Sequence, residues 1–556
     1  MNMSTTDVLD NQRRKRPEKP AVISKWQGAT FSYQKLYETS QDIAASLLAH
    51  GVRAADRVMV LAGNSIEYVQ LFFAVGGIGA IFAILNPTFT TEETLAAVDF
   101  LNPRAIFISE RIGYRKNHEL VAALTNKPAH TKLLVVQVGN AGRSLQGVLS
   151  WNEFIQNRPD SATALDEHWG KNDPDEALCL QFTSGTTGAR KGALLTHRNL
   201  INNAFLVGNR LSFSVDDILA CCPPLFHCFG LVCGVLATIT HGATVILPSE
   251  VFNADASLRA VTEDACTVIN AVPTMFQAML DQSQGTGLDT SGFRLRTGII
   301  AGSSLSETLL QRLDGEFGLR GLAYAFGMTE LSAVSFMTSP TQVSLLEERS
   351  SVGTLLPHTS AKVVDSDLLA LPPGSRGELL VAGDLVFKRY YRDPEKTGNT
   401  VAIDTQGRRW LRTGDIVELS SSGSCTVVGR TKDMIKRGGE NIAPRDIESV
   451  LELHPAIEAA AVVGVPNARW GEDVCAFVQR KQDNNTNQDS HQAELQGKLN
   501  TGGIKTWLRK QIAPHKVPQY VFWVGEDAGV PGRLPVNSSG KVLKRELSSI
   551  ANSLVR

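Results

Sequence analysis

The sequence Thr183-Ser-Gly-Thr-Thr-Gly-Ala-Arg-Lys-Gly192 follows directly on the apolar run Ala177–Phe182, and this succession decides the fold class. Gly185 and Gly188 allow the backbone to approach an anion closely, while the loop hydroxyls and the ammonium group of Lys191 add donors and positive charge. The spacing does not fit the GxxxxGK[ST] pattern of a Walker loop. We therefore predict a phosphate-binding loop of another type, placed after an apolar run.

Short apolar runs at 57–61, 105–108 and 243–247 alternate with helical patterns. This alternation predicts parallel strands joined by crossover helices, and hence an α/β fold class for the large domain. The most apolar stretch, Leu71–Leu85, is about fifteen residues long, whereas roughly 20 are needed to cross a bilayer. We expect it to form a buried helix.

The pattern changes after Gly353, where short strands separated by turn sequences continue to Val428 and indicate a smaller antiparallel, β-barrel-like subdomain. A compact α+β pattern follows, with a strand at 459–465 and a helix at 504–512. We therefore expect an N-terminal domain at 1–430 and a small C-terminal α+β domain at 431–556. The polar residues 481–503 predict a flexible surface insertion.

The charge balance, the cysteines and the first residues limit the possible partners and the cellular location. The 556 residues include 55 basic and 56 acidic side chains, so no overall field favours nucleic acid or an anionic membrane. Eight cysteines without a CxxC pair predict buried reduced thiols rather than a zinc site or disulfides. Neither a secretory signal nor a transit peptide fits the first residues, and we expect a cytoplasmic location, with a peroxisomal one left open.

Six further motif regions follow the phosphate loop in order: Pro223–Gly230, Ala301–Leu305, Phe326–Glu330, Trp410–Asp415, Gly429–Asp433 with Gly438–Asn441, and Ser539–Lys541. Together they resemble the acyl-adenylate-forming (AMP-binding) superfamily, in particular its medium-chain fatty acyl-CoA synthetases and fungal acyl-CoA ligases. The resemblance implies an acid-thiol ligase that uses ATP and Mg²⁺ to make an acyl-adenylate and then transfers the acyl group to CoA. It also implies that the C-terminal domain is mobile and turns about a hinge near Lys432.

The resemblance implies residue roles as well. Phe326 would stack on adenine, Asp415 and Arg430 would contact the ribose, and Glu330 would hold the metal. The full expected set for ATP or AMP is Thr183, Ser184, Gly185, Thr186, Thr187, Gly188, Lys191, Gly302, Ser303, Phe326, Gly327, Met328, Thr329, Asp415, Arg430 and Lys541.

For catalysis the resemblance implies Lys541, His227, Lys432, Thr329 and Glu330, with Lys541 contacting both the phosphate and the acyl carboxylate. CoA would pass Lys436, Gly438 and Gly439. The acid would meet His227, Phe229, Ser304 and Ala333.

Three alternatives stay open. His227 is either a gate at the acid pocket or a packed core histidine. The acyl acceptor is either CoA or the phosphopantetheine group of a carrier protein. A third reading is a catalytically silent homologue that binds a nucleotide or acyl group, although the presence of Lys191, Glu330, Asp415 and Lys541 speaks against it.

Overall fold

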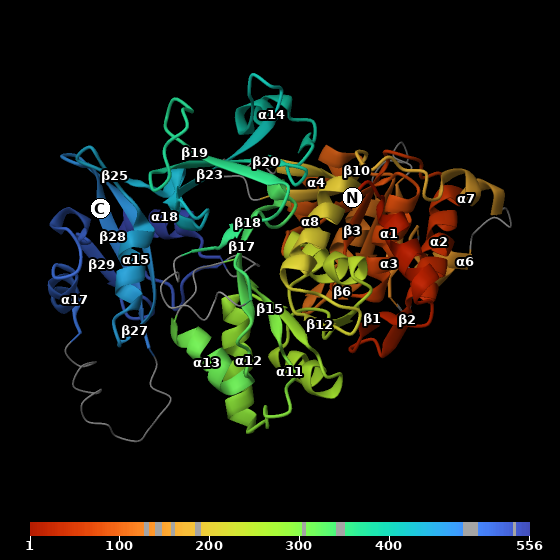
Figure 1. Ribbon diagram of the computed structural model, residues 1–556, viewed down its shortest axis with the longest axis horizontal. Coiled ribbons are helices and arrows are strands. Elements are labelled where there is room, and N and C mark those ends of the chain that lie inside the picture. Colours follow the sequence, from red (N-terminus) through yellow and green to blue (C-terminus); the bar gives the residue numbers. More distant parts are fainter. Residues whose placement is uncertain are drawn as a thin grey trace. The chain divides into compact units, whose positions relative to one another are not determined.

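The chain divides into two compact units in the computed structural model (Figure 1). The first unit comprises residues 1–361 and 381–411, and the second comprises 362–380 and 412–556. The chain passes between the units three times, within a β-rich segment. The domain boundary predicted at 430/431 stays a prediction. The structure describes residues 1–126, 133–139, 147–156, 162–183, 191–302, 307–340, 351–481, 499–536 and 541–555.

An eight-stranded sheet in the first unit has the order β21-β11-β10-β4-β3-β5-β8-β9. The strands from β10 to β9 run parallel, and β11 and β21 join antiparallel at one edge. Parallel pairing of apolar runs confirms the α/β prediction. The bounds are β3 Arg57–Leu61, β4 Ile81–Ile84, β5 Ala105–Ser109, β8 Leu134–Val138, β9 Leu149–Ser150, β10 Ala177–Thr183, β11 Lys191–Thr196 and β21 Arg389–Tyr390.

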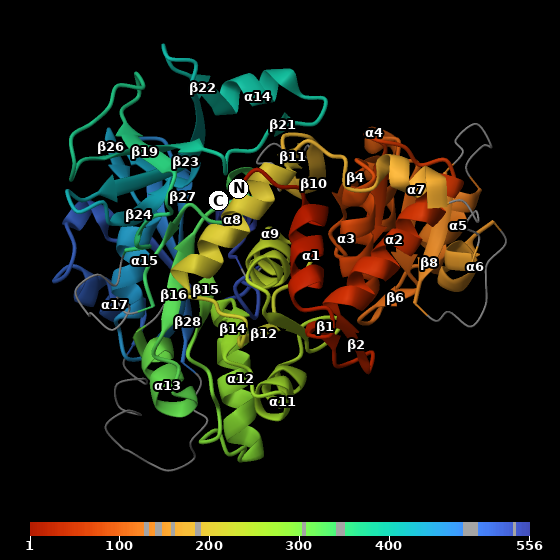
Figure 2. The same ribbon diagram turned by 45° about the vertical axis from the view of Figure 1, so that its right-hand side comes forward.

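A nine-stranded sheet completes the first unit in the order β18-β17-β16-β15-β14-β12-β13-β1-β2, with a parallel centre and antiparallel ends. Helices α11, α12 and α13 lie side by side along it (Figure 2). The strand bounds are β1 Pro20–Ser24, β2 Ala29–Ser32, β12 Ile218–Cys221, β13 Thr244–Leu247, β14 Val268–Ala271, β15 Thr297–Ala301, β16 Leu322–Phe326, β17 Phe336–Met337 and β18 Thr354–Leu355.

Helices connect these strands, as the crossover pattern requires. Most begin at a polar N-cap, for example Ser65 before α3 and Thr196 before α8. The helices are α1 Thr5–Lys15, α2 Tyr33–Ala49, α3 Ile66–Gly77, α4 Thr91–Leu101, α5 His118–Thr125, α6 Trp151–Gln156, α7 Ala162–His168, α8 His197–Arg210, α9 Cys228–Gly230, the π-helix η1 Leu231–Leu236, α10 Ala237–Thr240, α11 Ala254–Glu263, α12 Pro273–Thr286, α13 Glu307–Phe317 and α14 Pro394–Thr400.

The prediction of one buried helix over Leu71–Leu85 is wrong. Helix α3 ends at Gly77, and the following apolar residues form the buried strand β4. Gly79 adopts φ +72° between them, a left-handed conformation that ends a helix and that glycine reaches without strain. Periodicity alone could not separate the two elements, because both are buried on all sides.

The third sheet, β19-β20-β23-β22 with β24 paired to β23, carries the chain between the units. Its antiparallel pairs at β22–β23 and β23–β24 agree with the predicted antiparallel subdomain. The bounds are β19 Thr359–Val364, β20 Arg376–Gly383, β22 Val401–Ile403, β23 Arg409–Leu419 and β24 Cys425–Arg430.

The rest of the second unit is an α+β fold around the sheet β26-β25-β28-β27, with β29 beside β28. The predicted helix at 504–512 instead spans Thr501–Leu508, because Asn500 caps it by accepting a hydrogen bond from the backbone N–H of Gly503. Most of the predicted insertion, residues 482–498, lies outside the described residues. The bounds are β25 Ile435–Arg437, β26 Glu440–Ile442, α15 Pro444–Glu452, β27 Ile457–Asn467, β28 Gly471–Arg480, α17 Thr501–Leu508, β29 Tyr520–Trp523 and α18 Lys544–Leu554.

All eight cysteines belong to the described part of the chain, and all are free and buried, which confirms the prediction of buried reduced thiols. Within the same part of the chain, no helix has the length and apolar character needed to cross a membrane.

Candidate active site

The two ends of the predicted phosphate loop are neighbours in the sheet. Thr183 ends β10 and pairs with Lys191, the first residue of β11. The Thr183 hydroxyl donates to Oε1 of Glu330 at 3.4 Å. The loop residues between them, including the predicted Ser184, Gly185, Thr186, Thr187 and Gly188, lie outside the described residues. The described loop ends thus lie beside a buried carboxylate.

Glu330 is 5% exposed and lies in the short helix η2, Thr329–Leu331. The hydroxyl of Tyr390 donates to its Oε1 at 2.7 Å, and its backbone carbonyl accepts from the N–H of Phe387 at 2.9 Å. Burial, followed by the Glu330 charge, raises the pKa of Tyr390, so the phenol stays protonated and acts as a donor. Sequence reasoning missed Tyr390, because its pairing with Glu330 depends on β21 joining β11.

The residues around Glu330 fit a magnesium ion. In the described part of the chain, no three His, Cys, Asp or Glu side chains gather as a metal site. Magnesium is commonly held by one or two carboxylates together with substrate phosphates and water. A metal bound at Glu330 would therefore take its remaining ligands from a nucleotide and from solvent.

The backbone next to Glu330 is strained. Ser332 and Ala333 adopt φ +60° and +129°, which non-glycine residues rarely do. The Ser332 hydroxyl donates to the carbonyl of Leu385 at 2.7 Å. At Gly327 a Cβ atom would lie 1.7 Å from the carbonyl oxygen of Ala333, so only glycine fits there. Such conformations persist only where surrounding contacts enforce them.

The predicted adenine residue, Phe326, ends β16 and pairs with Phe336 of β17. The two rings lie 6.4 Å apart between centroids in an edge-on arrangement. Phe326 is partly exposed, which leaves part of its side chain free to meet a ligand. Gly302 follows β15 with φ +100°, whereas the predicted Ser303 and Ser304 lie outside the described residues.

His227 is the N-cap of the short helix α9, and its Nδ1 accepts a hydrogen bond from the backbone N–H of Phe229 at 3.1 Å. Burial lowers the pKa of His227 to about 4, so the imidazole is neutral near pH 7 and carries its proton on Nε2. The ring is therefore a hydrogen-bond donor at Nε2. The residue as a whole is partly exposed, so the gate and the packed core histidine both stay open.

The candidate site of the second unit is built on β23 and β24. Asp415 and Arg430 pair across these strands, and Arg430 Nε lies 2.9 Å from Asp415 Oδ1. Asp415 is 3% exposed, and its Oδ2 has no hydrogen-bond partner among the described residues. Burial raises the pKa of Asp415, while Arg430 opposes the shift. A buried acceptor without a partner fits a ligand that donates hydrogen bonds, such as a ribose.

Two lysines lie close enough to Asp415 to interact with its charge. Lys541 directly follows residues 537–540, which are outside the described residues, and Val536 pairs with Val542 in an isolated antiparallel bridge. Desolvation, followed by the charge of Arg430, lowers the pKa of Lys541 to about 8, although the residue as a whole is exposed. Desolvation also lowers the pKa of the exposed Lys432, in the 3-10 helix Thr431–Asp433.

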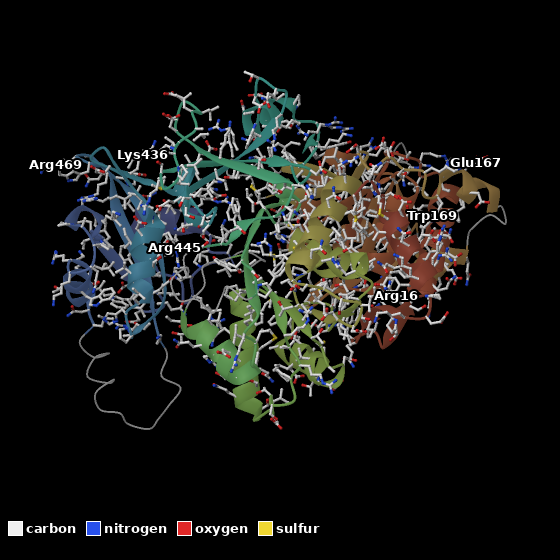
Figure 3. The ribbon with its side chains drawn as sticks, viewed as in Figure 1. Arg16, Glu167, Trp169, Lys436, Arg445 and Arg469 are labelled. Carbon is white, nitrogen blue, oxygen red and sulfur yellow. The ribbon has the colours of Figure 1, made fainter. Side chains whose placement is uncertain are left out.

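Gly438 and Gly439 form the two-residue turn between β25 and β26, with φ +59° and +88°. These values fit the hairpin turns that favour glycine. A Cβ atom on Gly438 would lie 3.0 Å from the ring of Trp470. Lys436 lies on the same hairpin, and Figure 3 shows it with Arg469 on the β25 side of the second unit.

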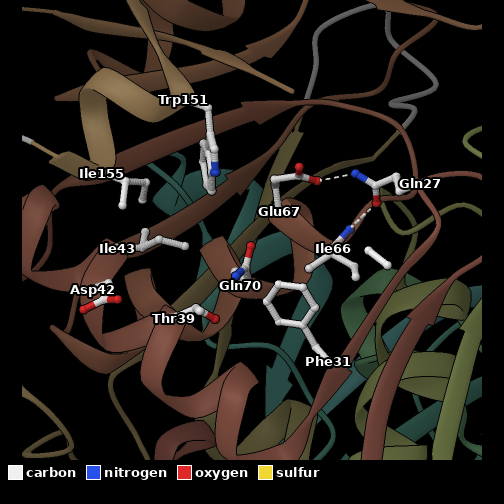
Figure 4. A pocket seen from close by; sticks show the side chains of 11 residues that line it. Gln27, Phe31, Thr39, Asp42, Ile43, Ile66, Glu67, Gln70, Trp151 and Ile155 are labelled. Carbon is white, nitrogen blue, oxygen red and sulfur yellow. Dashed lines mark hydrogen bonds between the residues drawn. The ribbon is translucent and has the colours of Figure 1, made fainter. Parts of the chain in front are cut away.

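A separate pocket of about 260 Å³ lies in the first unit, among β2, α2, α3 and α6 (Figure 4). Gln27 closes one side of it by accepting from the N–H of Ile66 and donating to Glu67 Oε2, at 2.9 and 2.8 Å. None of its lining residues belongs to a predicted motif. It is therefore distinct from the candidate active site.

Family models match most of the chain. The model described as AMP-binding enzyme matches residues 9–391, and the model described as AMP-binding enzyme C-terminal domain matches residues 446–541.

Curated relatives and solved structures match over nearly the full length. The acyl-CoA ligase sidI of Aspergillus fumigatus is 37% identical, covering 100% of this chain and 92% of that protein. The mitochondrial medium-chain acyl-CoA ligase ACSF2 of Rattus norvegicus is 30% identical, covering 98% and 87%. The structure of ATP-bound MatB from Rhodopseudomonas palustris is 26% identical with a TM-score of 0.82, covering 100% of both chains.

Proposed function

Because the chain belongs to the AMP-binding enzyme family and is an acyl-CoA ligase, we propose that it activates a medium-chain fatty acid or a related carboxylic acid. An oxygen of the acid attacks the α-phosphorus of ATP, and the bond to pyrophosphate breaks. The CoA sulfur then attacks the acyl carbonyl, its proton is released, and AMP leaves. The relatives named acyl-CoA ligase, and the ATP bound to the related MatB, support this reaction.

The observation that carries the acid class is the apolar character of the segments expected to meet the acid. Phe229 and Ala333, two of the residues expected to meet the acid, are buried and apolar. His227, whose Nδ1 accepts from the N–H of Phe229, is neutral, because burial lowers its pKa. An environment of this kind favours an uncharged aliphatic or aromatic tail and offers the acid a hydrogen-bond donor rather than a fixed charge.

The chain's own residues would act mainly by placing and neutralising charge, since phosphoryl chemistry needs little covalent assistance. Asp415 Oδ2 would accept from a ribose hydroxyl, and Lys541 would add positive charge near the phosphate. Glu330, held by Tyr390 and Thr183, would be the protein ligand of Mg²⁺. When bound, Mg²⁺ would offset phosphate charge.

The test is acid-dependent exchange of labelled pyrophosphate into ATP over a panel of C4 to C18 fatty, hydroxy and aromatic acids, followed by thioester formation with CoA. Exchange that peaks with medium-chain acids and yields acyl-CoA supports the proposal. Exchange with another acid class, or transfer only to a purified carrier protein, contradicts the proposed acid or acceptor.

A further inference from the structure

Asn64 lies outside every motif, yet it holds the segment that leads to His227. It is 4% exposed and lies between β3 and α3. Its Nδ2 donates to the carbonyl of Pro223 at 3.2 Å, and its Oδ1 accepts from the N–H of Leu225 at 2.8 Å. The side-chain amide thus supplies one donor and one acceptor, the same groups that a peptide unit of a neighbouring strand would supply.

The held segment needs such a partner because it leaves the sheet. Strand β12 ends at Cys221, and α9 begins only at Cys228. Pro224 has no N–H to donate. A buried carbonyl or N–H without a partner is costly, so the Asn64 amide stabilises this one course of the backbone over others.

Short contacts link the Pro223–Leu225 segment to His227. The carbonyl of Pro224 accepts from the N–H of His227 at 3.2 Å. A Cβ atom on Gly230 would lie 2.3 Å from the same oxygen, so no side chain fits between the two turns. A shift at Pro223–Leu225 therefore moves the backbone that carries the His227 ring.

Asn64 is itself fixed on both sides. Its N–H donates to the carbonyl of Glu250 at 2.9 Å, and its carbonyl accepts from the indole Nε1 of Trp26 at 2.8 Å. An amide held in this way provides a rigid support rather than an adaptable contact.

We propose that Asn64 is a positioning residue that holds the Pro223–Leu225 turn, and through it His227, in the geometry that the acid requires. The part concerning the acid rests on the proposed function. The part concerning the turn does not, because it follows from hydrogen bonds within the first unit.

The neighbouring Cys228 gives a readout that is independent of activity. Its thiol is buried beside His227, and burial raises its pKa to about 12, so alkylation requires the turn to open. In Asn64→Ala we expect Cys228 to react with N-ethylmaleimide roughly tenfold faster or more, because two buried backbone groups lose their partner. Peptide mapping by mass spectrometry follows each cysteine separately.

The matched control is Asn117→Ala, which removes another buried asparagine of the same unit. Asn117 is 2% exposed, and its Nδ2 donates to the carbonyl of Ser109 at 2.9 Å. It should leave Cys228 labelling at the wild-type rate. Cys179 of β10 and Cys475 of β28 serve as internal references in every variant. Equal acceleration at all cysteines would mean general destabilisation and would overturn the proposal, as would unchanged labelling of Cys228.

The kinetic arm uses pyrophosphate exchange with the best acid of the panel. Asn64→Ala should raise the KM for the acid several-fold and leave the KM for ATP near the wild-type value. An equal rise of both constants overturns the role in acid placement. If wild-type protein gives no exchange with any acid, the proposed function fails, and the labelling experiment alone decides the role of Asn64.

Discussion

The turn that carries His227 and the strand pair that carries Asp415 and Arg430 fix their side chains in different ways. Asp415 and Arg430 lie in neighbouring strands, so the register of β23 and β24 brings them together. His227 lies on irregular backbone, held by an asparagine far away in the sequence. A regular sheet positions its own residues, whereas a turn needs support from elsewhere.

The backbone that follows Glu330 is also irregular and is supported by a residue from elsewhere in the sequence. After the strained Ala333, the carbonyl and N–H of Val334 bond to the side chain of Asn203, at 2.6 and 3.1 Å. Asn203 is buried in α8, more than a hundred residues earlier. Buried asparagines thus support both the turn that leads to His227 and the segment that follows Glu330.

The largest expected effect concerns a charged residue of the second unit, the unit that carries the Asp415–Arg430 strand pair. Lys541→Ala should slow pyrophosphate exchange by roughly 10²–10³-fold, because a cation aimed at developing phosphate charge is lost. Thioester formation from supplied acyl-adenylate should be spared. Lys510→Ala, an exposed lysine of the same unit, is the control and should retain full exchange. Equal loss of both half-reactions in Lys541→Ala would contradict a role confined to adenylation.

Removing Arg430 tests whether the strand pair depends on charge as well as register. Arg430→Ala removes the ion-pair partner of the buried Asp415 and should lower the free energy of local unfolding by about 3 kcal/mol at pH 7. Hydrogen exchange of peptides from β23 and β24 measures this loss.

The sign of the pH dependence follows from the raised pKa of Asp415 in the folded protein. The folded state then binds a proton more tightly than the unfolded chain, so stability falls as pH rises through the folded pKa. The cost of Arg430→Ala should therefore shrink at acidic pH. Asp415→Asn combined with Arg430→Ala should recover most of the loss, and a double variant as unstable as the single one would contradict this account.

The pH profile separates the two regions in one experiment. The kcat/KM for adenylation should fall about tenfold per pH unit above pH 8, because Lys541 loses its proton there. His227 should add no step between pH 5.5 and 7.5, because its pKa is lowered to about 4.

Lys541→Arg provides the control, since arginine stays charged and should remove the alkaline fall. A loss of stability on deprotonation of Lys541 cannot cause that alkaline fall in kcat/KM. The folded pKa lies below the ordinary value of 10.5, so loss of the proton favours the folded state. An identical fall in wild type and Lys541→Arg would assign the step to another group.

The strands could be predicted from local patterns in the sequence. The runs at 57–61, 105–108, 243–247 and 459–465 all form strands, because apolar β-branched residues bounded by turns suit a buried sheet. The prediction for Leu71–Leu85 was wrong because a buried helix and a buried strand have the same apolar pattern. Only the glycines between the two elements mark where the helix ends.

The supports of the site were not predictable in this way. Asn64 meets Pro223 and Leu225 across 159 and 161 residues, and Tyr390 meets Glu330 across 60. A single asparagine or tyrosine has no pattern of its own, and only the folded sheets bring these partners together. The motifs therefore identified candidate groups but not the contacts that hold them.

The smallest expected effect concerns Tyr390, which restrains one oxygen of Glu330. Tyr390→Phe removes the 2.7 Å hydrogen bond and keeps the ring that packs on Phe387 and lies under Lys191. Thr183 still donates to the same oxygen, so the carboxylate keeps one restraint. We expect the Mg²⁺ concentration for half-maximal exchange to rise several-fold, because the loss of one charge-assisted hydrogen bond lets the ligand reorient.

The matched control is Tyr391→Phe, since the neighbouring ring packs on Phe100 and Arg392 rather than on Glu330. It should leave the Mg²⁺ dependence unchanged. An equal response of the two variants would mean that the Tyr390 hydroxyl does not place Glu330. The contrast between a self-positioning sheet and a side-chain-supported turn would then not extend to Glu330 itself.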